Sequence, residues 1–186
     1  MPAVITPLNI HVGRGDLWMG VAAPVSPPVP LTGGLPATGR FVGATISAAN
    51  FIYRPVTFDI RTQQDTGIVG YVITEEDVRL EFEIGELTYE NLRDFMIGAF
   101  DQGTFVSIGS IIIPPVSSIL LIAPKRTGGS AFIEVMLYAC VFSEDRTFPF
   151  QRQGWTNVRI IARGQSTLTR QQGDRLAFFH PNVISS

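Results

Sequence analysis

Three glutamates that lie close together in the sequence are the residues best suited to acid–base chemistry. Glu81, Glu83 and Glu86 suggest the pair of carboxyl groups with which glycoside hydrolases protonate a leaving group and attack the sugar. Glu81 and Glu83 are, however, alternate residues of one predicted strand, so both side chains point to the same polar face. Charged side chains on an outward face are usually solvated. We therefore interpret them as surface residues and expect no catalytic pair.

Histidine and cysteine are scarce in this sequence. His11, His180 and Cys140 show no spacing typical of metal ligands. Motifs for a serine nucleophile, for phosphate binding and for dinucleotide binding are missing as well. Cys140 lies in an apolar run, which favours a small buried hydrophobe over a nucleophile, and a single thiol excludes an intramolecular disulfide. The sequence therefore predicts no catalytic residue, no metal and no cofactor.

The composition describes one globular domain over residues 1–186. Hydrophobic residues make up 45% of the chain, and its length suffices for a full core. Charged residues make up only 16%, which is below the usual quarter or so. A subunit that hides surface against copies of itself needs less charge than a lone globule. A surface rich in serine, threonine and glutamine explains the same composition.

Charge is distributed unevenly along the chain. Residues 61–100 carry three arginines against nine acidic residues, whereas residues 101–186 carry eight basic and five acidic residues. An acidic middle and a basic end can meet in a head-to-tail contact between copies. Two solvated faces explain the same distribution. The sequence has no basic stripe of the kind that binds nucleic acid.

The clearest structural pattern lies in residues 77–84, where apolar residues occupy every second position from Val78 to Ile84. This period of two predicts a strand with one buried face. After Gly85 the period becomes helical, and we predict a helix over about residues 88–101, with Thr88 as its N-cap. The apolar stripe of this helix consists of Leu92, Phe95, Met96, Ala99 and Phe100.

Most of the remaining chain is predicted as short strands, at about residues 4–12, 41–47, 51–60, 71–74, 105–108, 111–113, 118–122, 132–142, 158–162 and 176–179. A segment rich in proline and glycine, at about residues 13–39, is expected to form an arm or loop. Residues 61–76 are expected to form a mobile hairpin or loop, and Pro55 indicates a bulged or edge strand. We therefore predict a mainly β fold, a β-sandwich or barrel of about eight to ten strands with one α-helix.

The start of the chain lacks the basic region of a signal peptide, and two prolines interrupt the apolar residues 105–124. We therefore expect a protein that is made in a cytoplasm and does not insert into a membrane. Residues 78–84 form a long, regular strand that is charged on one face only. Such a strand at a sheet edge invites pairing, and in an oligomer the strands of neighbouring subunits can continue one sheet.

Several of these segments resemble the tail tube (major tail) proteins of long-tailed bacteriophages. In that family a strand that ends in a turn similar to Glu-Leu-Thr-x-Glu-Asn-Leu leads into the single helix. The resemblance covers roughly residues 40–180. It is carried by residues 51–60, the polar Asp65-Thr66-Gly67, residues 78–92 with this turn, and closing strands at 131–142, 148–151, 158–165 and 173–178.

The resemblance implies a structural virion protein that catalyses no reaction. Tail tube proteins form six-fold rings that stack into a hollow tube, in which inner strands join into one β-barrel with the helix outside it. Genomic DNA passes through the lumen without specific binding. The implied partners are copies of the chain, a tape-measure protein, and tail terminator and tip proteins. The implied location is the virion tail, after synthesis in the host cytoplasm.

The resemblance also assigns roles to individual residues. The loop at residues 61–76 would contact the neighbouring subunit or ring, with Gln63, Gln64, Asp65, Thr66, Gly67, Glu75 and Glu76 as candidates. Glu81 and Glu83 are candidates for the lumen, where acidic side chains would repel DNA phosphates and keep passing DNA from sticking.

Three other functions remain open. The tube of a related contractile injection or secretion machine shares the fold and differs in its partners. A monomeric β-barrel that binds a small ligand predicts an apolar cavity and a ligand that raises the melting temperature. An enzyme would require a cluster of strongly perturbed carboxyl groups in a cleft.

Overall fold

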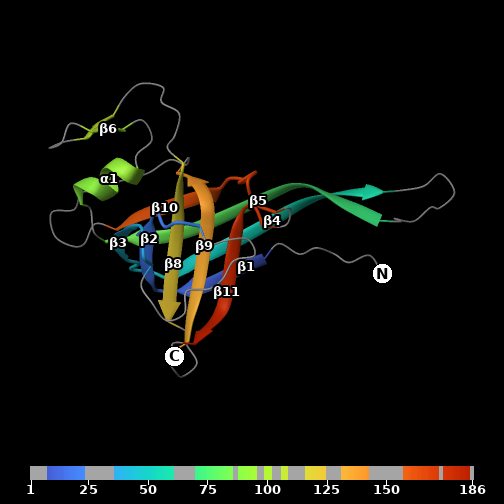
Figure 1. Ribbon diagram of the computed structural model, residues 1–186, viewed down its shortest axis with the longest axis horizontal. Coiled ribbons are helices and arrows are strands. Elements are labelled where there is room, and N and C mark those ends of the chain that lie inside the picture. Colours follow the sequence, from blue (N-terminus) through green and yellow to red (C-terminus); the bar gives the residue numbers. More distant parts are fainter. Residues whose placement is uncertain are drawn as a thin grey trace.

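The computed structural model describes residues 8–23, 36–60, 70–85, 88–95, 99–101, 106–108, 116–124, 131–142, 157–171 and 174–184. Within these residues the protein has eleven strands and one short helix (Figure 1), so the predicted mainly β fold with one helix is confirmed. The strands are β1 (Leu8–Gly13), β2 (Asp16–Met19), β3 (Arg40–Ala44), β4 (Ala49–Ile60), β5 (Gly70–Ile84), β6 (Ala99–Asp101), β7 (Val106–Ile108), β8 (Ser117–Pro124), β9 (Ala131–Val141), β10 (Val158–Gly164) and β11 (Ala177–Ile184), and the helix α1 is Tyr89–Phe95.

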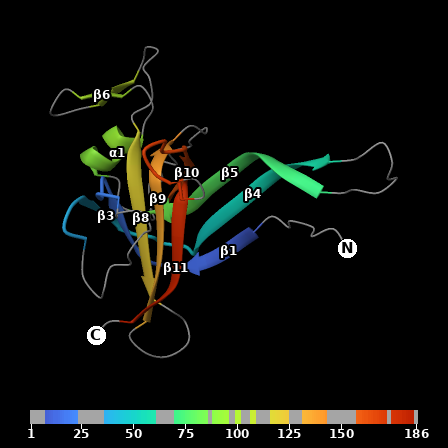
Figure 2. The ribbon, with the colours of Figure 1, turned by 45° about the vertical axis from the view of Figure 1, so that its right-hand side comes forward.

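Nine strands form one antiparallel sheet: eight follow the order β1-β4-β5-β10-β9-β8-β2-β3, and the ninth, β11, pairs with β9. β6 pairs with β7 separately. Two strands share one edge of β9. β10 pairs with it at Cys140 and Val141, and β11 pairs along residues 131–137. The sheet therefore folds into two layers, and the strands of one cross those of the other (Figure 2). The rings of Phe51 in β4 and Phe179 in β11 stack across the layers, with centroids 6.2 Å apart.

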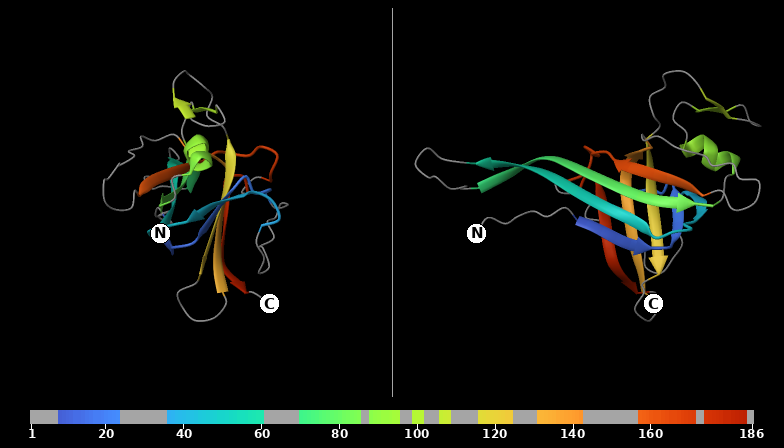
Figure 3. Two further views of the ribbon diagram at one scale, coloured as in Figure 1. Left: turned by 90° about the vertical axis from the view of Figure 1, so that its left-hand side faces the viewer. Right: turned by 180° about the vertical axis from the view of Figure 1, so that it is seen from behind.

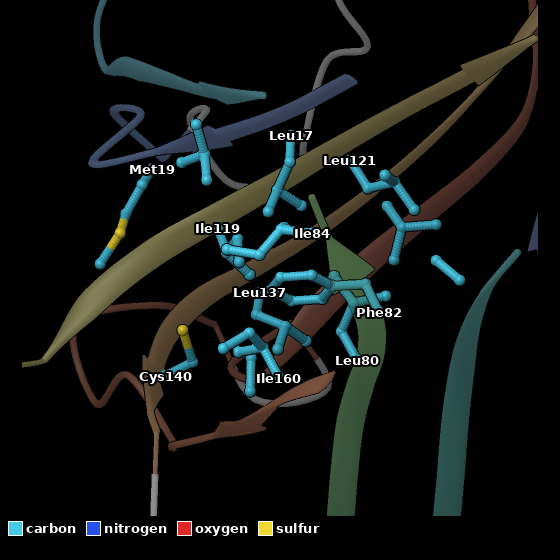
Figure 4. Packing of buried hydrophobic residues seen from close by; sticks show 14 of the residues in the cluster. Leu17, Met19, Leu80, Phe82, Ile84, Ile119, Leu121, Leu137, Cys140 and Ile160 are labelled. Carbon is cyan, nitrogen blue, oxygen red and sulfur yellow. The ribbon is translucent and has the colours of Figure 1, made fainter. Parts of the chain in front are cut away.

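The main core lies between these layers. The alternation of residues 78–84 is confirmed, because Val78, Leu80, Phe82 and Ile84 are all buried on one face of β5. They pack against apolar side chains from β2, β8, β9 and β10 (Figure 4). Each such side chain stabilises the fold by about 1.5–3 kcal/mol when fully buried. β5 is therefore fixed in the body at its C-terminal half.

A bulge in β9 decides where Cys140 points. Ser117 pairs with Cys140 and Ile119 with Leu137, so β9 has one more residue than β8 in this interval. The extra residue changes the alternation, and both Leu137 and Cys140 consequently join the main core. The prediction of Cys140 as a buried small hydrophobe is confirmed, and burial raises its pKa to about 12.

The helix α1 is shorter than the predicted residues 88–101. It begins as expected, because the Asn91 amide donates a hydrogen bond to the Thr88 Oγ1 at 3.2 Å. It ends at Phe95, whose ring meets those of Phe82 and Phe142 edge-on in the core. The expected helical residues Ala99 and Phe100 lie in β6 instead, which pairs with β7. In the sequence, Ile97 and Gly98 stand between Phe95 and Ala99, and both are poor helix formers.

Polar contacts fix α1 on the body through β3. The Arg40 guanidinium donates to the Asn91 Oδ1 and the Asp94 Oδ2, each at 2.7 Å. The buried Asn91 side chain also donates to the Val42 carbonyl at 3.0 Å. Figure 1 shows that α1 lies at the opposite end of the molecule from the projecting ends of β4 and β5. No helix in the described ranges is long and apolar enough to cross a bilayer.

The predicted loop at residues 13–39 is wrong in part. β2 lies within it and pairs with β8 on one side and β3 on the other. The five prolines of this segment begin only at Pro24, so residues 16–19 keep the backbone donors that a central strand needs. Residues 24–35 lie outside the described part of the chain.

Of the two alternatives predicted for residues 61–76, a hairpin or a loop, the described residues 70–76 belong to a hairpin. β5 runs without interruption from Gly70 to Ile84, so Glu75 and Glu76 lie in a strand opposite Val56 and Pro55. Residues 61–69 lie outside the description. The register shifts near Pro55 as expected, but the extra residue is Thr74 of β5, between the pairs Val56–Glu75 and Thr57–Ile73.

Candidate functional site

β4 and β5 extend beyond the body as a two-stranded arm, which we define as residues 54–60 and 70–77. In the body β4 is flanked by β1 up to Tyr53, and β5 is flanked by β10 up to Arg79. Farther out, no other described strand pairs with either of them, and the hairpin projects away from the two layers (Figure 3). The outer edges of the arm therefore carry backbone groups that can pair with an added strand.

Apolar side chains are concentrated on this arm. Six of the nine large hydrophobic residues that are exposed in the described ranges belong to it, with exposed fractions between 40% and 66%. They are Val56, Phe58, Ile60, Tyr71, Val72 and Ile73. Single exposed hydrophobic residues are common, but a cluster of them marks a surface that binds another molecule.

Most of these residues share the face of the arm that is turned away from the core. Phe58 lies opposite Val72 in the register, and Val56 lies opposite Glu75. Because side chains alternate along β4, this face is the one that carries Arg54, and not the core face of Tyr53. We call Val56, Phe58, Ile60 and Val72 the arm patch.

The same face is charged where β5 enters the body. The Asp77 carboxylate accepts hydrogen bonds from Arg79 at 2.8 Å and from Arg163 of β10 at 3.1 Å. The Glu81 carboxylate accepts one from Arg159 at 2.8 Å. Exposed ion pairs of this kind stabilise a fold by at most about 1 kcal/mol each. The outer face of the hairpin thus changes from paired charges in the body to apolar side chains in the arm.

The predicted site residues fall into three groups. Glu81 and Glu83 lie half-buried on one outer face of β5, as the alternation predicts, and Arg159 lies opposite Glu83 and binds Glu81. Glu75 and Glu76 lie exposed on opposite faces of the arm. The other candidates are outside the described residues: Gln63, Gln64, Asp65, Thr66 and Gly67.

A groove with a volume of about 510 Å³ opens at the root of the arm, on the core face of the hairpin. We call it the root groove. Tyr53 lines the root groove and donates a hydrogen bond to the Glu76 carboxylate at 2.7 Å. Burial, followed by this hydrogen bond, raises the pKa of Tyr53 to about 12. Its apolar wall consists of Phe51, Val78, Leu176 and Ala177, and its polar rim of Tyr53, Glu76, Ser166 and Arg175.

The connection between β10 and β11, which forms one side of the root groove, is held by a polar cluster. Tyr138 donates to the Asp174 carboxylate at 2.6 Å, and Arg170 donates to the same carboxylate at 2.7 Å. The Arg170 guanidinium also lies 3.8 Å from the centre of the Tyr138 ring. Arg175 donates to the Arg170 carbonyl at 3.2 Å. Arg175 is therefore linked to this cluster through Arg170.

Sequence reasoning did not identify the arm patch or the root groove. The alternation of Val56, Phe58 and Ile60 with the polar Thr57 and Asp59 was a usable signal for the patch. The groove joins residues more than a hundred positions apart, which no local pattern reveals. In the described part of the chain, no group of three or more histidine, cysteine and acidic side chains is placed to hold a metal. No protein-family model and no curated protein matches the chain.

Proposed function

We propose that this protein is a structural virion subunit that polymerises through its arm into stacked rings, forming the hollow tail tube of a bacteriophage. The observation that carries the proposal is the arm, a long hairpin with open edges and exposed apolar side chains. A monomer gains nothing from leaving such a surface in water, whereas a subunit buries it on assembly. The proposed partners are copies of the same chain.

A projecting arm that contacts a different surface on the next copy can build a ring or a tube. The arm projects from the body (Figure 3), and we infer that it contacts a surface on the next copy that differs from the arm itself. Contacts between two different surfaces are heterologous, and their repetition generates rings or open helical arrays. The resemblance to tail tube proteins adds the six-fold ring, the passage of DNA, the tape-measure, terminator and tip proteins, and the virion tail as location.

An arm-shortened variant tests the proposal. Replacing residues 57–74 by Asn-Gly leaves Val56 opposite Glu75, which is the arrangement that a two-residue hairpin turn requires. We expect this variant to keep the melting temperature of the wild type, because the main core contains no arm residue. Negative-stain electron microscopy over a concentration series should show rings or tubes for the wild type and none for the variant.

The matched control removes an exposed hydrophobic residue outside the arm. Leu168→Ser changes the most exposed of these residues, which lies between β10 and β11. This variant should assemble as the wild type does. Tubes that form normally without the arm would overturn the proposal.

The root groove supports a second candidate function, that of a monomeric module for a small apolar ligand. Its volume falls within the range of small-molecule sites. This candidate predicts a monomer at every concentration and a ligand that raises the melting temperature. The same concentration series therefore separates the two functions.

A further inference from the structure

We propose that the root groove of one copy receives the arm patch of a second copy, with Glu75 of the incoming arm beside Arg175 of the groove. This inference rests on the proposed self-assembly and names the surface that accepts the arm. Its basis is a match between two surfaces that the fold displays at different places on the hairpin.

The donor surface is apolar and ends in a charged border, where Glu75 is followed by Arg54 and Asp77, which lie opposite each other. Phe58 is 66% exposed and is the most exposed residue of the patch. Glu75 lies opposite Val56 on the same face and is also exposed. An arm that docks through this face therefore brings Glu75 together with four apolar side chains, and Arg54 and Asp77 follow at the base of the arm.

The acceptor surface has the complementary composition. Phe51, Val78, Leu176 and Ala177 form an apolar wall, and Arg175 stands at the rim. The second charged group of the groove, Glu76, accepts the hydrogen bond from Tyr53. Arg175 is the one positively charged residue among the described residues that line the groove, so it is the partner for an incoming carboxylate, and opposite charges at matching positions select the partner and its orientation.

The occupant must come from another copy because of the faces involved. The root groove opens on the core face of the hairpin, where Tyr53 and Val78 lie opposite each other. The arm patch lies on the other face of the same two strands. A hairpin cannot place one of its faces against the other, so the chain's own arm does not reach its own groove.

Two single-cysteine additions test the contact. Ser166→Cys places a thiol at the exposed rim of the groove with almost no change of shape, and Phe58→Cys places one in the patch. The two variants are purified separately, one with a size tag, then mixed under assembly conditions and oxidised. The native Cys140 is buried, and its pKa of about 12 keeps it protonated. We expect a mixed disulfide dimer on a non-reducing gel, with at least a tenfold excess over the control.

The matched control is Thr57→Cys mixed with Ser166→Cys. Thr57 is exposed and adjacent to Phe58, but its side chain lies on the opposite face of the arm. This mixture should give no mixed disulfide above the level of the wild type. Equal yields from the two mixtures would overturn the inference.

The outcomes separate this inference from the proposed function. Tubes without the mixed disulfide would overturn the groove as acceptor and leave self-assembly intact. A mixed disulfide in discrete dimers, with no ring or tube at any concentration, would support the groove contact and overturn the tube. A small molecule found in the purified monomer by native mass spectrometry, with neither disulfide nor tube, would overturn both in favour of the ligand-binding module.

Discussion

At the scale of single residues, Thr88 makes two contacts that start the helix. Its side-chain oxygen accepts from the Asn91 amide at 3.2 Å, and its carbonyl accepts from the Leu92 amide at 3.0 Å. Thr88→Ala removes the first contact only. We expect the free energy of unfolding, measured by urea denaturation, to fall by about 1 kcal/mol. Thr88→Ser keeps the hydroxyl and should restore most of the loss, and an alanine variant as stable as the wild type would show that the cap is not needed.

Cys140 makes the stability of the protein depend on pH above neutrality. Burial raises the pKa of its thiol from 9.0 to about 12. Between these values the unfolded thiol has lost its proton while the folded thiol keeps it, so the free energy of unfolding falls as the pH rises. Urea denaturation at pH 8 and pH 10 should show a smaller fall for Cys140→Ala than for the wild type. Tyr53, whose pKa is also raised, is present in both proteins and cancels from the comparison.

At the scale of elements, the arm differs from the body strands in how its backbone is protected. In the arm each strand pairs with one partner, so about half of its amides point to an open edge. We expect the amides of residues 54–60 to exchange with deuterium rapidly at concentrations below assembly and slowly above it. Residues 135–137 of β9, which pair on both sides, should be protected in both states. Arm exchange that does not change on assembly would exclude the arm from the contact.

The body half of β5 has a clear sequence signal, whereas in the arm half only the short strand at residues 71–74 is predicted. Val78 to Ile84 alternate because one face is buried, and this constraint produces the pattern. In residues 70–77 no face packs on the core, so nothing enforces alternation. Glu75 and Glu76 therefore fall in the predicted hairpin or loop at residues 61–76, although they lie in a strand.

Other features could not be predicted from the sequence, because pairing between distant segments of the chain decides them. The apolar spacing of residues 92–100 suits a helix, yet Ala99 and Phe100 pair with β7. The proline-rich segment concealed β2, which is held by β8 from a distant part of the sequence. The root groove depends on the β10–β11 connection passing the base of the arm. Local periodicity contains none of this information.

At the scale of the whole molecule, the uneven charge fits the proposed contact between copies. The acidic residues of the chain's middle lie partly on the arm, and the basic C-terminal part supplies Arg175 at the groove. An acid on the donor surface and a base on the acceptor surface of the same chain are what a repeating head-to-tail contact needs. The low overall charge is consistent with a surface that is largely covered by other copies.

This arrangement predicts an unusual result when two charge-reversed variants are mixed. Glu75→Arg puts two positive groups at every contact between its copies, and Arg175→Glu puts two negative groups there. Each variant alone should assemble at a critical concentration about two- to tenfold higher than that of the wild type, because an exposed pair contributes up to about 1 kcal/mol.

In an equimolar mixture every contact between unlike copies joins opposite charges, whichever copy supplies the arm. The mixture should therefore assemble near the wild-type concentration, as should a single chain that carries both changes. Glu90→Arg, on the exposed face of α1, is the control that should not rescue Arg175→Glu. Light scattering over a concentration series measures all of these values. Two variants that stay impaired when mixed would show that Glu75 and Arg175 do not meet, because a heterologous contact between these residues requires the rescue.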